Sequence, residues 1–269
     1  PRPTHLSLAL MLATFAAAPA ALAQAYPAKP VTIVVGYPAG GSTDLTGRTL
    51  GDALAKQLGV PVVIENLGGA GGAIGAQKVA SAAPDGYTLL VGANNEVAIS
   101  KLVTKTTRYD LKDFTPIGLI ASQPMVLVAS PSAGVKNLDE FLAKVKAAPG
   151  KFSYGSSGVG TALHLAGEMV KERAGLFMTH IPYRGVAPLT TDLVGGNLDY
   201  GVFVLSSGLP HIKSGKVVAL GTTEAKRSPL TADIPALGEH KALKGTDIGS
   251  WFVRMGPARL PDAVVARLK

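Results

Sequence analysis

Short apolar runs alternate with helix-like segments along most of this chain of 269 residues, and the alternation limits the folds that it can adopt. Residues 31–35 are almost continuously apolar, which is typical of a strand buried on both faces of a parallel sheet. Leucines spaced every four residues from 50 to 58 predict an amphipathic helix. Residues 62–64 and 87–91 are the next predicted strands, with a shorter helix between them. This β-α-β-α-β order predicts a parallel sheet with right-handed crossovers.

A second series of strands and helices follows Pro124. Its first helix begins at Asn137, where a Glu three residues later completes a capping pattern, and its second begins at Thr161. The strands predicted in this series are residues 125–129, 152–154, 179–181, 201–205 and 217–220. The chain therefore predicts two α/β lobes joined by two crossings. We expect residues 26–122 and 223–269 to form the first lobe, and residues 123–222 to form the second.

The first 25 residues have the order of a secretory signal. Arg2 is their one charge, an apolar run follows from 6 to 18, and a small-residue cleavage pattern ends at Ala25. A membrane span needs about 20 apolar residues, and a proline interrupts this run too early. We expect export to the periplasm with cleavage near Ala25; a buried N-terminal helix is the alternative. The chain lacks an initiator Met, and we expect the protein to continue at both ends.

The charge balance and the missing cysteines exclude several functional classes. With 26 Lys+Arg against 18 Asp+Glu, the chain has a formal charge of +8, which attracts anions of any size. No four basic residues occur in succession, so a nucleic-acid partner is not expected. Without Cys, the chain has no thiolate nucleophile, disulfide or Cys-based metal site. Its five His residues form no HExxH motif, and we expect neither a metal nor a cofactor.

Two loops rich in glycine and hydroxyl groups, at residues 37–44 and 154–161, each follow a predicted strand and precede a predicted helix. Ligands of open α/β sheets lie beyond the carboxyl ends of the strands. Helix N-termini there offer unpaired N–H groups and about half a unit of positive charge. One such loop is often ordinary turn-and-cap structure. A matching loop in each lobe predicts a cleft that binds an anion.

A secreted serine hydrolase is the alternative function, with Ser156 or Ser157 as the nucleophile and His164 as the base. A helix could bring Ser157 and His164 near each other. However, the nucleophile-elbow pattern GxSxG is missing and no acidic partner is evident. For His164 two roles stay open: a hydrogen-bond partner of the loop backbone, or a direct ligand contact.

A series of motifs runs in a fixed order from the end of the signal to residue 196. They are YPAKP (26–30), YPAGGSTD (37–44), EN with GAGG (65–66 and 69–72), PDGYTLL (84–90), YGSSGVGTALHL (154–165), HIPYRG (180–185) and DLVGG (192–196). As a set, this series resembles the Bug-type (TctC-like) extracytoplasmic solute-binding proteins of tripartite tricarboxylate transporters, and the resemblance covers the whole mature chain.

The resemblance implies a two-lobed periplasmic binding protein fold of the type II-like kind, each lobe a mixed, mainly parallel sheet flanked by helices. It also implies a receptor without catalysis that closes on a small organic carboxylate or an amino-acid-like anion. Such a receptor delivers its ligand to integral membrane transporter subunits; we expect a monomer. The residues that the resemblance assigns to the ligand are Gly40, Gly41, Ser42, Thr43, Gly158, Gly160, Thr161 and His164. Further candidates are Tyr37, Asp44, Asn94, Glu96 and Ser156, with Asp44 and His164 also candidates for bracing the loops.

Two segments depart from the family pattern. Asn94-Asn95-Glu96 follows the third predicted strand, where a short turn containing Ser or Thr is usual. Glu96 either points to solvent beside a surface cation, or faces the ligand and selects one with a donor or a positive group at its far end, because like charges repel in a partly dry cleft. Near the C-terminal end, Val253 and Arg254 replace a Gly and an aliphatic residue, and whether Arg254 faces the pocket stays open.

Overall fold

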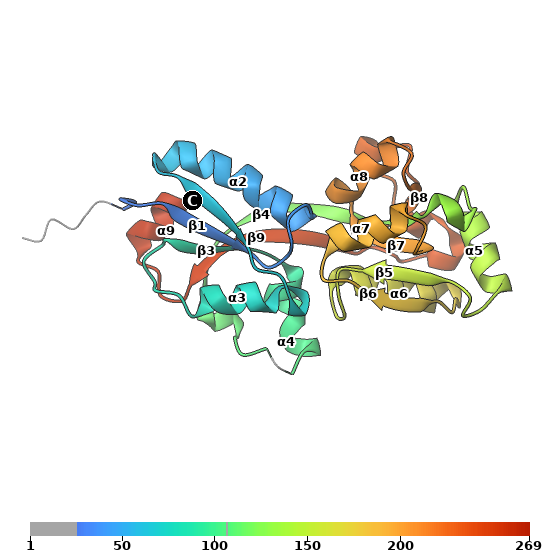
Figure 1. Cartoon of the computed structure of the whole chain (residues 1–269), viewed down its shortest axis with the longest axis horizontal. Helices are drawn as coiled ribbons and strands as arrows, with labels where there is room; N and C mark the ends of the chain where they lie inside the picture. Colours follow the sequence, from blue (N-terminus) through green and yellow to red (C-terminus); the bar gives the residue numbers. More distant parts are fainter. Residues whose placement is uncertain (1–25, 106) are drawn as a thin grey trace, which may run out of the picture.

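The computed structural model describes residues 26–105 and 107–269, so the predicted signal segment lies outside the described residues. Figure 1 shows an elongated molecule with two α/β lobes end to end, connected by the long strands β4 and β9. The predicted two-lobed α/β class is confirmed. In the described ranges, none of the helices combines the length and the apolar character that a membrane span needs.

The sheet of the first lobe has the strand order β2-β1-β3-β9-β4. β1 (Val31–Val35) pairs in parallel with β2 (Val62–Asn66) and β3 (Thr88–Ala93), as the sequence predicts. β9 (Gly249–Pro257) runs antiparallel to β3 and to the first part of β4 (Phe114–Ala129), which makes the sheet mixed. The helices of this lobe are α2 (Ser42–Leu58), α3 (Ala73–Ala80), α4 (Ser100–Val103) and α9 (Asp262–Leu268).

Strand β1 is apolar on both sides because helices cover both faces of the first sheet. Ile33 lies in one core cluster with Leu54 of α2 and Leu268 of α9. Val34 points to the other face and lies in a second cluster with Val79 of α3. The continuous apolar run predicted a strand that is buried on both faces, and the structure confirms this burial.

The second lobe is built around the other end of β4. β7 (Tyr200–Val204) and β8 (Val218–Thr222) pair antiparallel with this part of β4. β5 (Ser153–Ser156) continues the sheet in parallel with β7 and with β6 (Thr179–Pro182). The helices of this lobe are α5 (Leu138–Ala147), α6 (Ala162–Ala174), α7 (Val186–Val194) and α8 (Leu205–Lys213).

The chain crosses between the lobes within β4 and again between β8 and β9. β4 changes its partners near Pro124, from β9 before it to β7 and β8 after it. The N–H of Thr223 donates to the carbonyl of Met125 at 2.8 Å, and the N–H of Ile248 donates to the carbonyl of Thr223 at 2.9 Å. The hydroxyl of Thr223 also accepts from the N–H of Met125 at 3.0 Å. The hydrogen bonds of Thr223 thus hold the two segments that cross between the lobes next to each other.

The return segment, residues 223–248, packs with the second lobe. Ile234, Leu237 and Leu243 belong to the core cluster that contains Met125 of β4 and Phe141 of α5. The sequence predicts this polar, proline-containing segment in the first lobe, but its few apolar side chains join the larger core. On this packing we propose that the first lobe resumes at β9.

Candidate functional site

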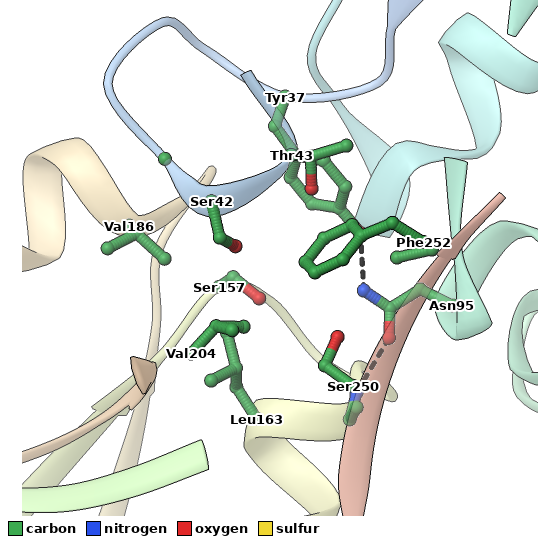
Figure 2. A pocket seen from close by; sticks show the side chains of 13 residues that line it. Tyr37, Ser42, Thr43, Asn95, Ser157, Leu163, Val186, Val204, Ser250 and Phe252 are labelled. Carbon is green, nitrogen blue, oxygen red and sulfur yellow. Dashed lines mark hydrogen bonds between the residues drawn. The ribbon is translucent and has the colours of Figure 1, made fainter. Parts of the chain in front are cut away.

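A narrow pocket lies between the lobes, beyond the carboxyl ends of β1 and β5 (Figure 2). Its cavity volume is only about 20 Å³. That is about the space that one water molecule needs, so the lobes must separate before a larger ligand can enter. Among the described residues, those that line the pocket are all uncharged: Tyr37, Gly41, Ser42, Thr43, Ala93, Asn95, Ser157, Ala162, Leu163, Val186, Val204, Ser250 and Phe252.

The first predicted loop brings two hydroxyl groups to the pocket. Gly41 is the N-cap of α2 and provides no side-chain cap, so the first turn of the helix keeps N–H groups without a side-chain partner. Ser42 and Thr43 follow in this turn, and both are buried in the pocket wall. Within the described part of the chain, neither hydroxyl donates a hydrogen bond to protein. These groups are free to bind a ligand.

Asp44 braces the same loop from behind. It is 3% exposed and does not line the pocket. One carboxylate oxygen accepts from the N–H of Gly40 at 2.9 Å and from Nε of Arg48 at 3.0 Å, and the other accepts from Nδ2 of Asn66 at 2.9 Å. Burial raises the pKa of Asp44, but these hydrogen bonds outweigh it and hold the pKa below its ordinary value. Asp44 therefore holds the loop in shape.

The second predicted loop contributes Ser157 to the pocket and uses Thr161 as a cap. Thr161 is the N-cap of α6, and its hydroxyl accepts from the N–H of His164 at 3.3 Å and donates to the carbonyl of Gly158 at 2.8 Å. Gly158 and Gly160 have φ angles of 137° and 73°, a conformation that glycine adopts without strain. Gly158, Gly160 and Thr161 thus shape the loop, while Ser157 lines the pocket.

His164 lies behind this loop. Its Nδ1 accepts from the N–H of Gly160 at 3.0 Å, and its ring stacks on His180 with the centroids 4.0 Å apart. Burial lowers the pKa of His164, and burial together with His164 lowers the pKa of His180 to about 4. Ser156 is fully buried, and its Oγ lies 2.7 Å from Nε2 of His180. None of these three side chains lines the pocket, and their hydrogen bonds hold the loop in shape.

The hydrolase alternative fails on this geometry. Nδ1 of His164 already accepts from the backbone of Gly160, so its lone pair cannot take a proton from Ser157. The hydroxyl of Ser157 instead donates to Thr161 at 3.2 Å. The serine that does meet a histidine, Ser156, is 0% exposed and out of reach of a substrate.

Asn95 links the two lobes across the pocket. Its Oδ1 accepts from the N–H of Ala162, the first residue of α6, at 2.7 Å. Its Nδ2 donates to the hydroxyl of Tyr37 at 2.6 Å, and that hydroxyl donates to the carbonyl of Gly71 at 2.7 Å. Figure 2 shows Asn95 between the tyrosine ring and the start of the helix. The contact joins the second lobe to the first directly at the site.

Comparisons with known proteins agree with this geometry. Residues 46–269 match the family model described as tripartite tricarboxylate transporter family receptor. The chain belongs to this family. BugT of Bordetella pertussis is 33% identical over 263 residues, which cover 97% of this chain and 80% of that protein.

Solved structures of relatives have the same fold. The periplasmic binding protein BugD shares 37% identity and superposes with a TM-score of 0.86 over 90% of this chain and 81% of that one. A protein of R. palustris solved with adipate shares 33% identity, with a TM-score of 0.88 over 90% of this chain and 81% of that one. The receptor is therefore a two-lobed solute-binding protein, and the comparisons give no support to the hydrolase. In the described ranges, no group of three or more His, Cys, Asp or Glu side chains could hold a metal ion.

Both arrangements expected for Glu96 are wrong. Its side chain is 2% exposed, so it does not reach solvent, and it does not line the pocket of Figure 2. It lies within the first lobe, where Oε2 accepts from the N–H of Ala93 at 2.9 Å and Oε1 has no partner among the described residues. A short π-helical turn, Asn95–Ile99, places Glu96 inward and Asn95 toward the pocket.

The other departures from the family pattern lie outside the pocket. Asn94 donates from Nδ2 to the carbonyl of Gly249 at 3.3 Å and accepts from the hydroxyl of Ser250 at 3.3 Å, so it braces β9. Arg254 lies on β9 and lines a different hollow, with Ile117 of β4.

Sequence reasoning about the receptor missed nine of the residues that line the pocket. Asn95 was visible only as one residue of an unusual polar turn, and nothing in the turn marks which side chain faces the ligand. The apolar members come from the end of β3, the starts of α6 and α7, the end of β7 and β9, which meet only after the sheet has formed. The lining residues that were missed are Ala93, Asn95, Ser157 (named only as the hydrolase nucleophile), Ala162, Leu163, Val186, Val204, Ser250 and Phe252.

Proposed function

We propose that this receptor captures a small organic carboxylate between its lobes in the periplasm and delivers it to the membrane subunits of a tripartite tricarboxylate-type transporter. The observation that supports this most is the pocket of uncharged hydrogen-bond donors at the N-terminus of α2, since such a site suits an anion. The adipate found with the relative from R. palustris is an anion of this class.

In this proposal the carboxylate lies between the two helix N-termini. The first turn of α2 supplies backbone N–H groups and the hydroxyls of Ser42 and Thr43. On the second lobe, the hydroxyl of Ser157 turns from Thr161 to the ligand when the carboxylate binds, and so adds a donor. Because each lobe contributes donors, the ligand stabilises the closed arrangement of the lobes, and closure is the signal that membrane subunits can recognise.

We further propose that the signal segment is removed near Ala25 and that the mature receptor is a monomer. The order of charge, apolar run and small residues in the first 25 residues supports the cleavage. Mass spectrometry of the protein secreted by a bacterial host gives the mature N-terminus, and Tyr26 is the expected first residue.

Isothermal titration calorimetry tests the binding function. The purified chain is unfolded, dialysed and refolded to remove bound ligand, and is then titrated with adipate, succinate and citrate. We expect at least one carboxylate to bind, and Ser42→Ala and Thr43→Val each to weaken it about tenfold or more, since a hydrogen bond to a charged group contributes about 1.5–3 kcal/mol.

The matched control is Thr191→Val. Thr191 is exposed on α7, and its hydroxyl donates to the carbonyl of Ala187. The control should leave the affinity unchanged. Equal affinity in the wild type and in both pocket variants would contradict the proposed site, and an absence of binding to all three carboxylates would count against the proposed function itself.

A further inference from the structure

A second, larger hollow adjoins the pocket between the lobes. Its cavity volume is about 300 Å³. It shares Tyr37 and Ser157 with the inner pocket, so these two side chains form the boundary between the inner and outer spaces. The first lobe contributes Thr104 and residues 69–72, and the second contributes residues 157–159 and 182–184. We call this space the outer chamber.

Three of the six residues that the first lobe contributes to this wall are glycines. Gly69, Gly71 and Gly72 have φ angles of 137°, 62° and 96°, which favour glycine. The hydroxyl of Tyr37 is held by the carbonyl of Gly71 and by the amide of Asn95, so its ring stays at the boundary. The outer chamber therefore keeps its space while the inner pocket is narrow.

Arg184 gives the outer chamber its charge. Among the described residues that line the two spaces, Arg184 is the only charged one. It is exposed and lies between β6 and Gly185, the N-cap of α7. Within the described part of the chain Arg184 forms no ion pair. The carboxylate of Asp192 on α7 accepts from the hydroxyl of Tyr183, the residue before Arg184, at 2.8 Å.

We propose that the outer chamber is a second anion subsite, in which Arg184 binds the far carboxylate of a dicarboxylate whose near carboxylate lies in the inner pocket. The proposal rests on the proposed function, because it needs the first carboxylate in the inner pocket. A planar guanidinium can pair with a carboxylate through two parallel hydrogen bonds, which an ammonium cannot do.

The two spaces would then have separate roles in recognition. The inner pocket holds only neutral donors, so it accepts one carboxylate from a monoacid or a diacid alike. Only a diacid places a second charge beside Arg184. Tyr37 and Ser157 come from different lobes, so the ligand passes between them when the lobes are apart and is held on both sides when they close.

Calorimetry with matched acids tests this subsite. Ligand-free protein is titrated with succinate against butanoate, glutarate against pentanoate, and adipate against hexanoate; each pair has the same number of carbons and differs in one carboxylate. We expect the wild type to prefer the diacid, and Arg184→Gln to weaken the best diacid about tenfold while changing its monoacid less than twofold. Arg184→Lys should restore part of the loss.

The control for net charge is Lys146→Gln. Lys146 is exposed on α5, at the end of the molecule away from the first lobe (Figure 1). Lys146→Gln should change neither the affinity for the diacid nor the affinity for the matched monoacid. The subsite is overturned if Arg184→Gln weakens diacid and monoacid equally, or weakens neither. If no acid binds the wild type, the proposed function fails as well; if monoacids bind as tightly as diacids, the subsite alone fails.

Discussion

Glu96 should make the stability of this receptor depend on pH, and Glu96→Gln should remove that dependence. The carboxyl is 2% exposed, and Oε1 has no partner among the described residues. A Cβ added at Gly72 would clash with the carboxyl group of Glu96, so the side chain is confined against the backbone of the glycine-rich turn. Burial raises its pKa from 4.5 to about 7, although the hydrogen bond from the N–H of Ala93 opposes the rise.

The direction of this pH dependence follows from whether the folded or the unfolded chain holds the proton of Glu96. Between pH 4.5 and 7 the folded receptor keeps Glu96 protonated, while the unfolded chain releases the proton. The free energy of unfolding therefore falls as the pH rises through this range, at about 1.4 kcal/mol per pH unit. The whole shift corresponds to about 3 kcal/mol, which is fully present below pH 4.5 and lost above about pH 7. Glu96→Gln carries no such proton.

Urea denaturation at pH 4.5 and pH 8 measures the effect. Relative to the wild type, Glu96→Gln should gain about 3 kcal/mol of unfolding free energy between the two pH values, whatever its absolute stability at either one. Other titrating groups cancel in this difference because both proteins share them. Glu172→Gln is the matched control, since Glu172 is exposed on α6. If the two variants show the same pH dependence as the wild type, the carboxyl of Glu96 is not buried as described.

Three further substitutions test single contacts. Asn95→Ala removes the hydrogen bond to Ala162 between the lobes; at about 1 kcal/mol, ligand dissociation in stopped-flow should be about fivefold faster, and an unchanged rate would contradict the link. Thr161→Val removes the cap of α6 and should lower the unfolding free energy by about 1 kcal/mol. A tenfold loss of affinity at unchanged stability would show instead that the Thr161 hydroxyl binds the ligand. Thr223→Val leaves the N–H of Met125 without its partner at the crossing and should cost about 1–3 kcal/mol in thermal unfolding; an unaltered melting temperature would show that the crossing does not need this hydroxyl.

Local patterns predicted the elements that depend on short stretches of sequence. The apolar run of β1 predicted a strand covered on both faces, and core clusters lie on both sides of it. Asn137 predicted a helix start, and its side chain accepts from the N–H of Glu140 at 2.9 Å. These features follow from periodicity and capping, which act over a few residues.

Features that depend on contacts between residues far apart in the chain could not be predicted from the sequence. β4 is 16 residues long and changes partners near Pro124. The sequence predicts the boundary between the lobes close to this residue, but no local pattern shows that one continuous strand belongs to both lobes. The burial of Glu96 comes from a π-helical turn and from the approach of the glycine-rich turn at Gly72. Asn95 reaches Ala162 only because two lobes meet.

The loops themselves were found from the sequence, but the roles within them needed the structure. Glycine, serine and threonine in 37–44 and 154–161 indicated an anion site. The sequence does not show that the hydroxyl of Thr161 is used in capping while those of Ser42 and Thr43 are free. A hydroxyl's partner is set by the three-dimensional course of the loop, which residue type alone does not fix.

The most direct test of the central claim is to identify what the receptor holds. The protein is purified from its native periplasm, denatured to release bound small molecules, and the released compounds are identified by mass spectrometry and titrated back onto the stripped protein. The account predicts a small organic acid that rebinds in a one-to-one ratio and rebinds more weakly to Ser42→Ala. A released molecule without a carboxylate that rebinds equally well to wild type and Ser42→Ala would contradict it.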